Sequence, residues 1–209
     1  MKLYTFPLSH NSVKVMAVLN HLGIQPEIEI LDLTKGESQT PEFKALNPNG
    51  KIPTLQDGDF ILWESHAIMR YLAEKHESDL IPTDIQRRAE MNQWLSWHLA
   101  HLGPAIGGVI WERVASKFFE GYEPDEHNHK KCLANLERFA PVLDKHLENR
   151  KFVVGDKLTL ADFDMASSFI HIEMAQLPVT RYKHIMLWFQ RIVEIPAFRN
   201  ALPPAPVKA

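Results

Sequence analysis

Hydroxyl and amide side chains gather in a short loop near the start of the chain. Ser9, Asn11 and Ser12 lie between a β-favouring run and a helical pattern. Ligands of open α/β sheets bind at the carboxyl ends of strands, and donors at a helix N-terminus stabilise a thiolate and lower the pKa of a thiol from about 8.5. We expect Ser12 to cap the helix and Ser9 to face a ligand. The simpler interpretation is that both serines only cap the helix.

A second polar pair stands where another strand ends and a helix begins. Ser65 is predicted to be the capping or first residue of that helix, with its hydroxyl and backbone N–H at the positive end of the dipole. Such a position binds carboxylates, and the neighbouring Glu64 is a candidate partner for an ammonium group. A plain capping serine beside a solvated glutamate explains the same pair.

A third segment, NPNGKIPTL at 47–55, leads from a turn to an X-Pro bond before a short strand. Proline cannot donate to a sheet ladder, so Pro53 belongs at the start or edge of a strand. With a cis bond, Ile52 can present its N–H and C=O to an extended peptide; the alternative is an ordinary trans turn, which is commoner. Together the three segments suit a short peptide that ends in an α-amino acid.

The composition is that of a soluble globular protein. The chain has 209 residues, of which 45% are hydrophobic and 23% charged, and a net charge of −3. This charge balance argues against a nucleic-acid partner, and no run approaches the ~20 apolar residues of a membrane span. One cysteine, Cys132, excludes an internal disulfide and a thiolate zinc site. With no secretory signal visible, we expect a cytoplasmic protein with no membrane partner.

The elements that must position these residues divide the chain in two. The first part alternates strands and helices, with Asp57-Gly58-Asp59 as a hairpin turn; the predicted elements are 2–6, 12–22, 27–31, 54–56, 60–63 and 65–76. The second part is helical, with a possible break near Gly103-Pro104 or Gly107-Gly108 and another at Pro141; its predicted helices are 83–120, 126–147, 159–174 and 183–193. We predict an α/β domain over 1–79, a linker over 80–83 and an all-helical domain over 84–209.

These segments, in this order, resemble the soluble glutathione transferase family. The resemblance rests on the first loop, on NPNGKIPTL, on ESHAI at 64–68 and on LTLADF at 158–163. It implies an N-terminal thioredoxin-like domain (βαβ-α-ββα), an all-helical second domain, and a cytoplasmic homodimer. The implied activity is conjugation of the glutathione thiolate to a hydrophobic electrophile, with glutathione as co-substrate and no metal. The chain is similar to serine-type bacterial, theta or phi members, because Ser9 matches the serine of these members. The first loop contains no tyrosine, and Tyr4 lies within the preceding strand.

The resemblance implies a role for each residue of the glutathione site. Ser9 would keep the sulfur as thiolate with Asn11 assisting, and which of the two holds it stays open. Glu64 and Ser65 would take the γ-glutamyl ammonium and carboxylate. The remaining implied glutathione-binding residues are Gln39, Lys51, Ile52 and a cis Pro53. Ser38 and Gln39 stand where plant-type members often carry His or Lys, so one cationic contact to the glycine carboxylate is missing.

Further roles follow from the same resemblance. Candidate residues of the electrophile pocket are Leu8, His10, Trp111, Phe118 and Phe119, although the aromatic ones are equally expected in a core or a dimer contact. Thr159 and Asp162 match a structural helix cap. His98 and His101 share a helical face, but no third ligand accompanies them, so we expect core or surface histidines and no metal.

Two other functions compete with conjugation. In a glutathione-dependent disulfide reductase or peroxidase, Asn11 would matter more than Ser9. A non-catalytic binding module with the same fold is the third possibility, and the joint presence of Ser9, Lys51, Glu64 and Ser65 speaks against it.

Overall fold

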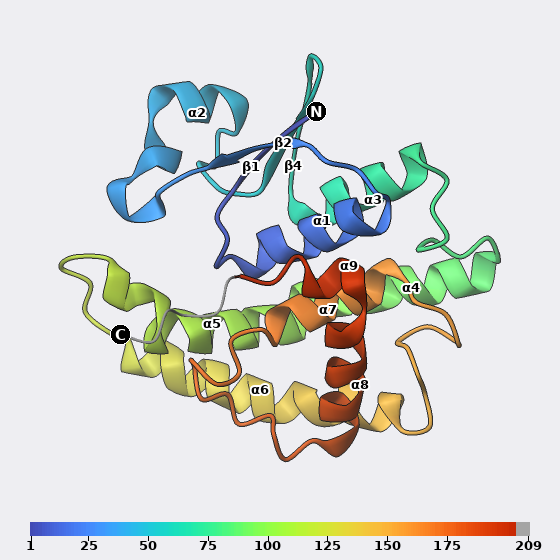
Figure 1. Cartoon of the computed structure of the whole chain (residues 1–209). Helices are drawn as coiled ribbons and strands as arrows, with labels where there is room; N and C mark the ends of the chain where they lie inside the picture. The colour runs from blue at the N-terminus through green and yellow to red at the C-terminus, as the bar shows by residue number, and fades with distance from the viewer. Residues whose placement is uncertain (204–209) are drawn as a thin grey trace. The chain divides into compact units, whose positions relative to one another are not determined.

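The computed structural model describes residues 1–203. The first part of the chain forms a four-stranded sheet (Figure 1). The strands are β1 (Lys2–Thr5), β2 (Glu27–Ile30), β3 (Thr54–Asp57) and β4 (Phe60–Trp63), in the order β2-β1-β3-β4. β2 runs parallel to β1, whereas β3 is antiparallel to both β1 and β4. It follows that β1, β2 and β4 point the same way and that their carboxyl ends share one edge of the sheet.

Helices cover the two faces of this sheet. α1 (His10–His21) and α3 (Ser65–Lys75) pack together on one side, and α2 (Pro41–Leu46) lies on the other (Figure 1). Side chains alternate along a strand, so Leu3 is fully buried toward α1 and α3, while the Tyr4 ring meets Phe43 of α2 at 5.6 Å. Two single turns of 3-10 helix, Leu33–Lys35 and Glu37–Gln39, precede α2. The predicted thioredoxin-like arrangement is confirmed.

The C-terminal helix α9 (Pro196–Arg199) belongs with this first unit. It packs against α1, and the Asn20 side-chain amide donates to the Ala197 carbonyl at 3.0 Å. Of the described residues, 1–78 and 194–203 form one compact unit and 79–193 form the other. The predicted domain bounds, 1–79, 80–83 and 84–209, stay a prediction. α9 was not predicted as an element, because a helix of four residues carries too weak a periodic signal. Residues 204–209 lie outside the described residues.

The second unit, residues 79–193, is built of helices joined by turns and contains no strand. Its main helices are α4 (Ile85–Trp97), α5 (Gly103–Arg113), α6 (Glu126–Leu147), α7 (Leu160–Ser168) and α8 (Lys183–Glu194). The break expected near Gly103-Pro104 takes the form of a π-helical turn, His98–Leu102, after which Pro104 occupies the first turn of α5. Proline is tolerated there because the first N–H groups of a helix have no intrahelical partner. A 3-10 turn, Ala115–Phe118, follows α5.

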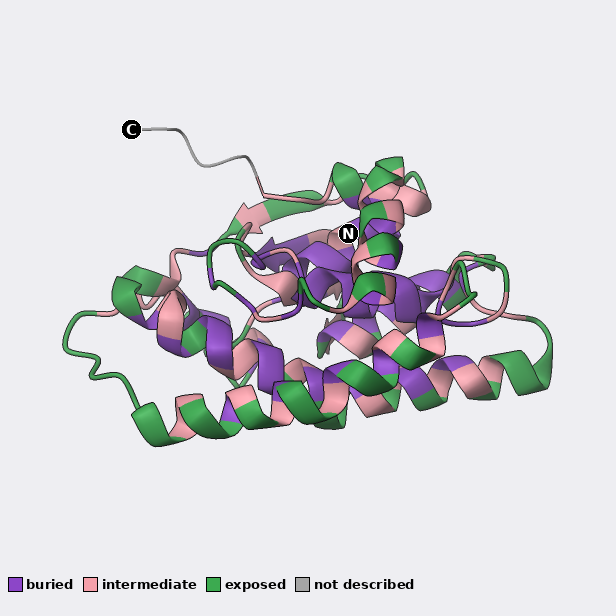
Figure 2. Cartoon of the chain, turned by 90° about the horizontal axis from the view of Figure 1, so that it is seen from below, coloured by how far each residue is buried: buried purple, intermediate pink, exposed green. Residues whose placement is uncertain are grey.

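The long helix α6 presents one buried stripe and one exposed side, as Figure 2 shows along its length. Its buried residues recur at the helical period and are Cys132, Leu136, Ala140, Leu143 and Leu147. Pro141, which was expected to kink or break the helix, lies within it on the exposed side without ending it. Packing of the apolar stripe outweighs the lost backbone hydrogen bond.

Helix α7 is buried along its whole length and is held by one carboxylate. Thr159 is its N-cap residue, and the N–H and hydroxyl of Thr159 donate to Asp162 at 2.9 and 3.1 Å. The Val153 N–H and the Trp188 indole N–H donate to the other oxygen of Asp162, both at 2.9 Å. Burial raises the pKa of Asp162 to about 6 in spite of these donors. A single side chain thus joins α7, α8 and the loop between α6 and α7.

The end predicted for one helix of the second unit is wrong. α7 ends at Ser168 rather than at the predicted residue 174. The Ser167 hydroxyl donates to the Asp164 carbonyl at 2.7 Å, and this local bond competes with continuation of the helix.

Within residues 1–203, no helix is both long enough and apolar enough to cross a membrane.

Close contact between α5 and α6 gives a test of the helical unit. A Cβ added at Gly108 would lie 2.3 Å from the Cys132 sulfur, whereas one at Gly107 would meet nothing within 4 Å. We expect Gly108→Ala to lower the free energy of unfolding by about 1–3 kcal/mol through overpacking. Gly107→Ala should be neutral or stabilising by up to about 1 kcal/mol, because alanine favours the helix. Urea unfolding measures both.

The double variant Gly108→Ala/Cys132→Ala removes the clashing sulfur. It should recover most of the stability lost in Gly108→Ala. Equal stability of the two glycine variants would contradict this helix contact.

Candidate active site

The N-termini of two helices meet at one edge of the sheet. α1 begins soon after β1 and α3 begins directly after β4, and these strands run in the same direction. β3 starts at that edge, since Thr54 pairs with Tyr4 of β1 on one side and with Trp63 of β4 on the other. The strand register thus brings the first loop, the segment before Thr54 and the Glu64–Ser65 pair together. All belong to the first unit.

Ser9 is the N-cap residue of α1, and its hydroxyl is unengaged. Its carbonyl accepts from the N–H groups of Ser12 and Val13 at 2.9 and 3.0 Å. Its side chain makes no capping bond and has no hydrogen-bond partner in the described part of the chain. The expectation that Ser12 caps the helix is corrected: α1 begins at His10, and the buried Ser12 hydroxyl accepts from the Phe6 N–H at 3.4 Å.

Glu64 is the N-cap residue of α3 and has an unusual backbone. Its φ of 71° and ψ of 114° lie in a region that residues other than glycine rarely adopt. Such a conformation costs about 1–3 kcal/mol and is concentrated at ligand sites. The Glu64 side chain is exposed and makes no capping bond. Its carboxylate is available to a cationic group of a ligand.

Ser65 is the first residue of α3 and is 9% exposed. Its hydroxyl donates to the Asn11 side-chain oxygen at 3.3 Å. The backbone N–H groups in the first turn of a helix have no intrahelical acceptor and carry a partial positive charge. Ser65 therefore has a hydroxyl and an N–H group that can bind an anion together, and this hydroxyl is in contact with Asn11.

A buried asparagine fixes the loop that precedes β3. The Asn47 side-chain N–H group donates to the Lys51 carbonyl at 2.8 Å and to the Thr54 hydroxyl at 3.1 Å, and its oxygen accepts from the Asn49 N–H at 3.0 Å. The Thr54 hydroxyl also donates to the Lys51 carbonyl, at 3.1 Å. Two donors thus hold the residue immediately before Ile52. Within residues 1–203, the backbone of Ile52 takes part in no hydrogen bond.

The Ile52–Pro53 peptide bond is cis, as the resemblance implies. The Ile52 side chain packs against Tyr4, Leu31 and Phe43.

Gln39 supports the same loop from the other side. Its side-chain amide donates to the Gly50 carbonyl at 2.9 Å and to the Ser38 hydroxyl at 3.3 Å. Lys51, one residue further on, is exposed and has no ion-pair partner among the described residues. The cation of this loop is therefore Lys51, and the amide of Gln39 is used to hold the backbone that carries it.

The residues expected to line an electrophile pocket fall into both units. Leu8 is exposed and His10 half-buried in the loop of the first unit. In the second unit, the Trp111 ring meets Phe119 at 5.4 Å and Tyr122 at 5.5 Å, and Phe118 is 59% exposed. Trp111 and Phe118 are thus surface aromatics and do not belong to the core. The pocket itself remains a prediction.

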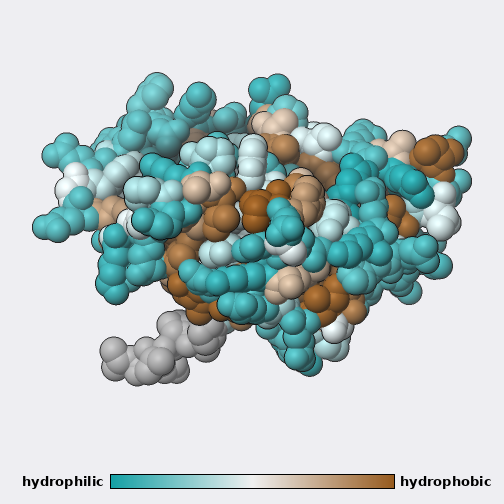
Figure 3. All heavy atoms as spheres, turned by 90° about the horizontal axis from the view of Figure 1, so that it is seen from above, coloured by the Kyte–Doolittle hydropathy of each residue, from teal (hydrophilic) through white to brown (hydrophobic). Residues whose placement is uncertain are grey.

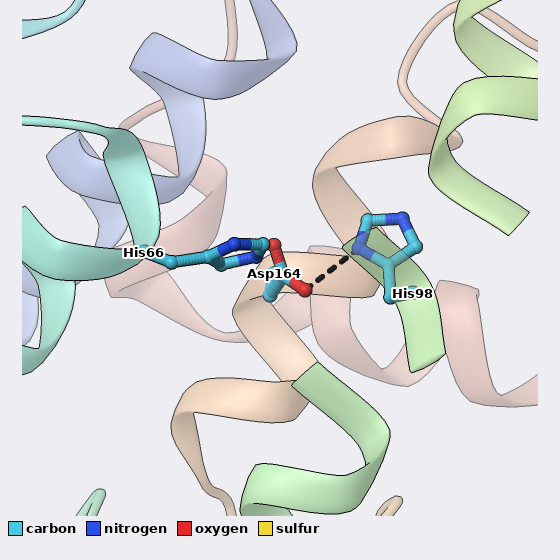
Figure 4. A group of neighbouring side chains, drawn as sticks. All are labelled: His66, His98 and Asp164. Carbon is cyan, nitrogen blue, oxygen red and sulfur yellow. Dashed lines mark hydrogen bonds and ion pairs between the residues drawn. The ribbon is translucent and has the colours of Figure 1, made fainter. Parts of the chain in front are cut away.

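The histidines singled out in the sequence have separate surroundings. His98 is buried in the second unit, where Nδ1 lies 2.7 Å from Asp164 (Figure 4) and Nε2 lies 3.0 Å from the Ser168 hydroxyl. His101 is exposed and stacks on the Phe139 ring at 4.9 Å.

Asn47 is the first residue of the NPNGKIPTL segment, but no role was predicted for its side chain. The Asn-Pro-Asn-Gly pattern is a turn signal in which asparagine bonds to nearby backbone, and this signal pointed to Asn47. Gln39, a glutathione contact by the resemblance, donates its side-chain N–H to the Gly50 carbonyl, and its contact with glutathione stays a prediction.

Comparisons with known proteins agree with this geometry. A family model described as "Glutathione S-transferase, N-terminal domain" matches residues 1–74, and "Glutathione S-transferase, C-terminal domain" matches 99–196. The chain is 36% identical to glutathione S-transferase 3 of Zea mays, over 99% of this chain and 97% of that protein. The chain belongs to the glutathione S-transferase family. The alignment with the maize protein covers nearly the whole chain, so the similarity includes both units of the enzyme.

Solved structures of other glutathione transferases resemble this glutathione S-transferase closely. Glutathione transferase F7 from Populus trichocarpa superposes with a TM-score of 0.88 at 28% identity and covers 96% of each chain. A family member from Pseudomonas fluorescens, described with two glutathione bound, gives a TM-score of 0.86 at 28% identity, over 97% of this chain and 92% of that one.

The loop that carries Lys51 can be tested at Gly50. A Cβ at Gly50, whose φ is +59°, would lie 2.6 Å from the Gln39 amide nitrogen and 2.8 Å from the Ser38 carbonyl oxygen. Gly58 has nearly the same φ, +61°, but open space around it. Both Gly→Ala variants carry the backbone strain of about 1 kcal/mol, and only Gly50→Ala adds a clash of about 1–3 kcal/mol.

We therefore expect Gly50→Ala to be the less stable variant in urea unfolding of the two proteins. If Gly58→Ala lowers the free energy of unfolding by the same amount as Gly50→Ala, the predicted clash of the Gly50 Cβ with Gln39 is contradicted.

Proposed function

We propose that this protein binds glutathione in its first unit and transfers the glutathione thiolate to a hydrophobic electrophile. The observation that carries the proposal is the unengaged Ser9 hydroxyl at the start of α1, at the same sheet edge as the Glu64–Ser65 pair at the start of α3. Membership of the glutathione S-transferase family supports it.

Each end of the tripeptide has a matching group on this edge. The γ-glutamyl carboxylate binds the hydroxyl and N–H of Ser65, and its ammonium binds Glu64, whose side chain is exposed. The cysteinyl backbone pairs with the N–H and C=O of Ile52, which make no other hydrogen bond within residues 1–203. The glycine carboxylate binds the Lys51 ammonium, and Pro53 and Gln39 support this loop.

Catalysis then comes from positioning and from a lower thiol pKa. The Ser9 hydroxyl donates to the sulfur, and the N-terminus of α1 adds a partial positive charge. One charge-assisted hydrogen bond of about 1.5–3 kcal/mol corresponds to roughly one to two pKa units. The thiol proton passes to solvent, the thiolate forms a carbon–sulfur bond, and the leaving group departs with its bonding electrons.

We further propose a cytoplasmic homodimer. The family resemblance leads to this proposal, and exposed hydrophobic side chains on the first unit, among them Phe60 and Trp63 of β4, are available for contact. In the face drawn in Figure 3 hydrophilic side chains predominate, and hydrophobic ones occur in small groups.

The thiol pKa of bound glutathione tests the proposed mechanism. Thiolate absorbance against pH should give a pKa about one unit or more below that of free glutathione. Ser9→Ala should return it toward the free value and lower kcat/KM with an activated aryl chloride by about tenfold to a hundredfold. Ser96→Ala, an exposed serine of α4, is the matched control and should change neither quantity.

A depressed thiol pKa that survives in Ser9→Ala would remove Ser9 from the mechanism. If glutathione does not bind at millimolar concentration, the chain is a binding module with the family fold.

A second candidate function is glutathione-dependent reduction of disulfides or peroxides. It is favoured by the similar structures from Pseudomonas fluorescens and Lodderomyces elongisporus, which are described with two glutathione bound, because reduction consumes two glutathione molecules. Turnover of a mixed disulfide at saturating glutathione should then exceed conjugation and should be strongly reduced in Asn11→Ala. Unchanged disulfide turnover in that variant contradicts this second function.

A further inference from the structure

Asn11 and Ser65 are far apart in the sequence but in contact in the first unit. The Ser65 hydroxyl lies 3.3 Å from the Asn11 side-chain oxygen. Asn11 is in the first turn of α1, and Ser65 is the first residue of α3. This hydrogen bond therefore joins the starts of the two helices that supply the sulfur end and the carboxylate end of the site.

The Asn11 side chain and the Ser9 hydroxyl have different surroundings. The Asn11 side-chain oxygen accepts from the Ser65 hydroxyl of α3, whereas the Ser9 hydroxyl makes no capping bond and has no hydrogen-bond partner within residues 1–203. The sequence left open which of these two residues holds the sulfur, and this arrangement separates their roles.

An asparagine amide suits a serine that must change its hydrogen bond when a ligand arrives. Without ligand, the Ser65 hydroxyl donates to the Asn11 oxygen. A carboxylate is an acceptor only, so it must receive that hydroxyl proton itself. A turn of the Asn11 amide then brings its N–H group to the Ser65 oxygen, and the hydroxyl proton is directed at the carboxylate. Aspartate in this position has no N–H to offer.

We propose that Asn11 is a positioning residue for the α-carboxylate of the γ-glutamyl group, acting through the Ser65 hydroxyl, and that it does not hold the sulfur. This inference rests on the proposed binding of glutathione in the first unit. It predicts that changes at Asn11 alter the affinity for glutathione and leave the thiol pKa of the bound molecule unchanged.

The test compares Asn11→Ala and Asn11→Asp with wild type by calorimetric titration of glutathione and by thiolate absorbance against pH. We expect Asn11→Ala to raise the Kd about fivefold to twentyfold, the effect of losing one hydrogen bond that aligns a charged contact. Asn11→Asp, which keeps the size of the side chain, should raise it further, because it retains the hydroxyl proton and repels the carboxylate. The bound thiol pKa should match wild type in both variants.

A double-mutant cycle separates this indirect role from an independent contact. If Asn11 acts through Ser65, Asn11→Ala/Ser65→Ala should have the same Kd as Ser65→Ala alone. Additive losses would overturn the inference. Glutathione that lacks the α-carboxylate gives a second check, since wild type and Asn11→Ala should bind it equally.

Asn135→Asp in α6 is the control for the added charge and should bind glutathione like wild type. A thiol pKa that rises in Asn11→Ala would assign Asn11 to the sulfur and overturn the inference. So would an unchanged Kd in both Asn11 variants. Failure of wild type to bind glutathione or to lower its thiol pKa is a different result, because it rejects the proposed function itself.

Discussion

The pairing of Thr54 with two strands at once is the constraint on which the site depends. Thr54 lies opposite Tyr4 on one side and Trp63 on the other, so the strand ends from which three distant segments leave are fixed to one another. A shift of one residue in this register would turn every side chain of β3 to the opposite face of the sheet. Leu55, fully buried, would then face away from α1 and α3. The hydrophobic core of the first unit thereby enforces the geometry of its polar edge.

Hydrogen bonds from neighbouring side chains hold the loop that carries Lys51 and Ile52. Asn47, Thr54 and Gln39 hold two carbonyl groups before Ile52, so the loop needs little ordering when a peptide binds. Lys51, the residue proposed to bind the glycine carboxylate, lies on the loop that Gln39 holds in place.

Much of this could be predicted from the sequence, because the informative signals were local. Turn residues, alternating hydrophobic runs and the Thr159–Asp162 spacing indicated the strands, the hairpin and the start of α7 without knowledge of the fold. The features that escaped prediction depend on partners distant in the chain. The contact between Asn11 and Ser65 requires two helices to be packed first, and α9 is defined by its packing on α1 rather than by its own pattern. The capping role was given to Ser12 because two serines stood within one turn, and only the backbone distinguishes them.

The packing of Gly108 against α6 also has a practical consequence for thiol chemistry. Cys132 is the only cysteine of the chain, and it is buried with its sulfur against that glycine. Burial raises the pKa of its thiol, which keeps it protonated and slow to react. We therefore expect the thiol of the native protein to react slowly with maleimide dyes and disulfide reagents. A cysteine introduced on the surface can carry a fluorophore or spin label at a single known place.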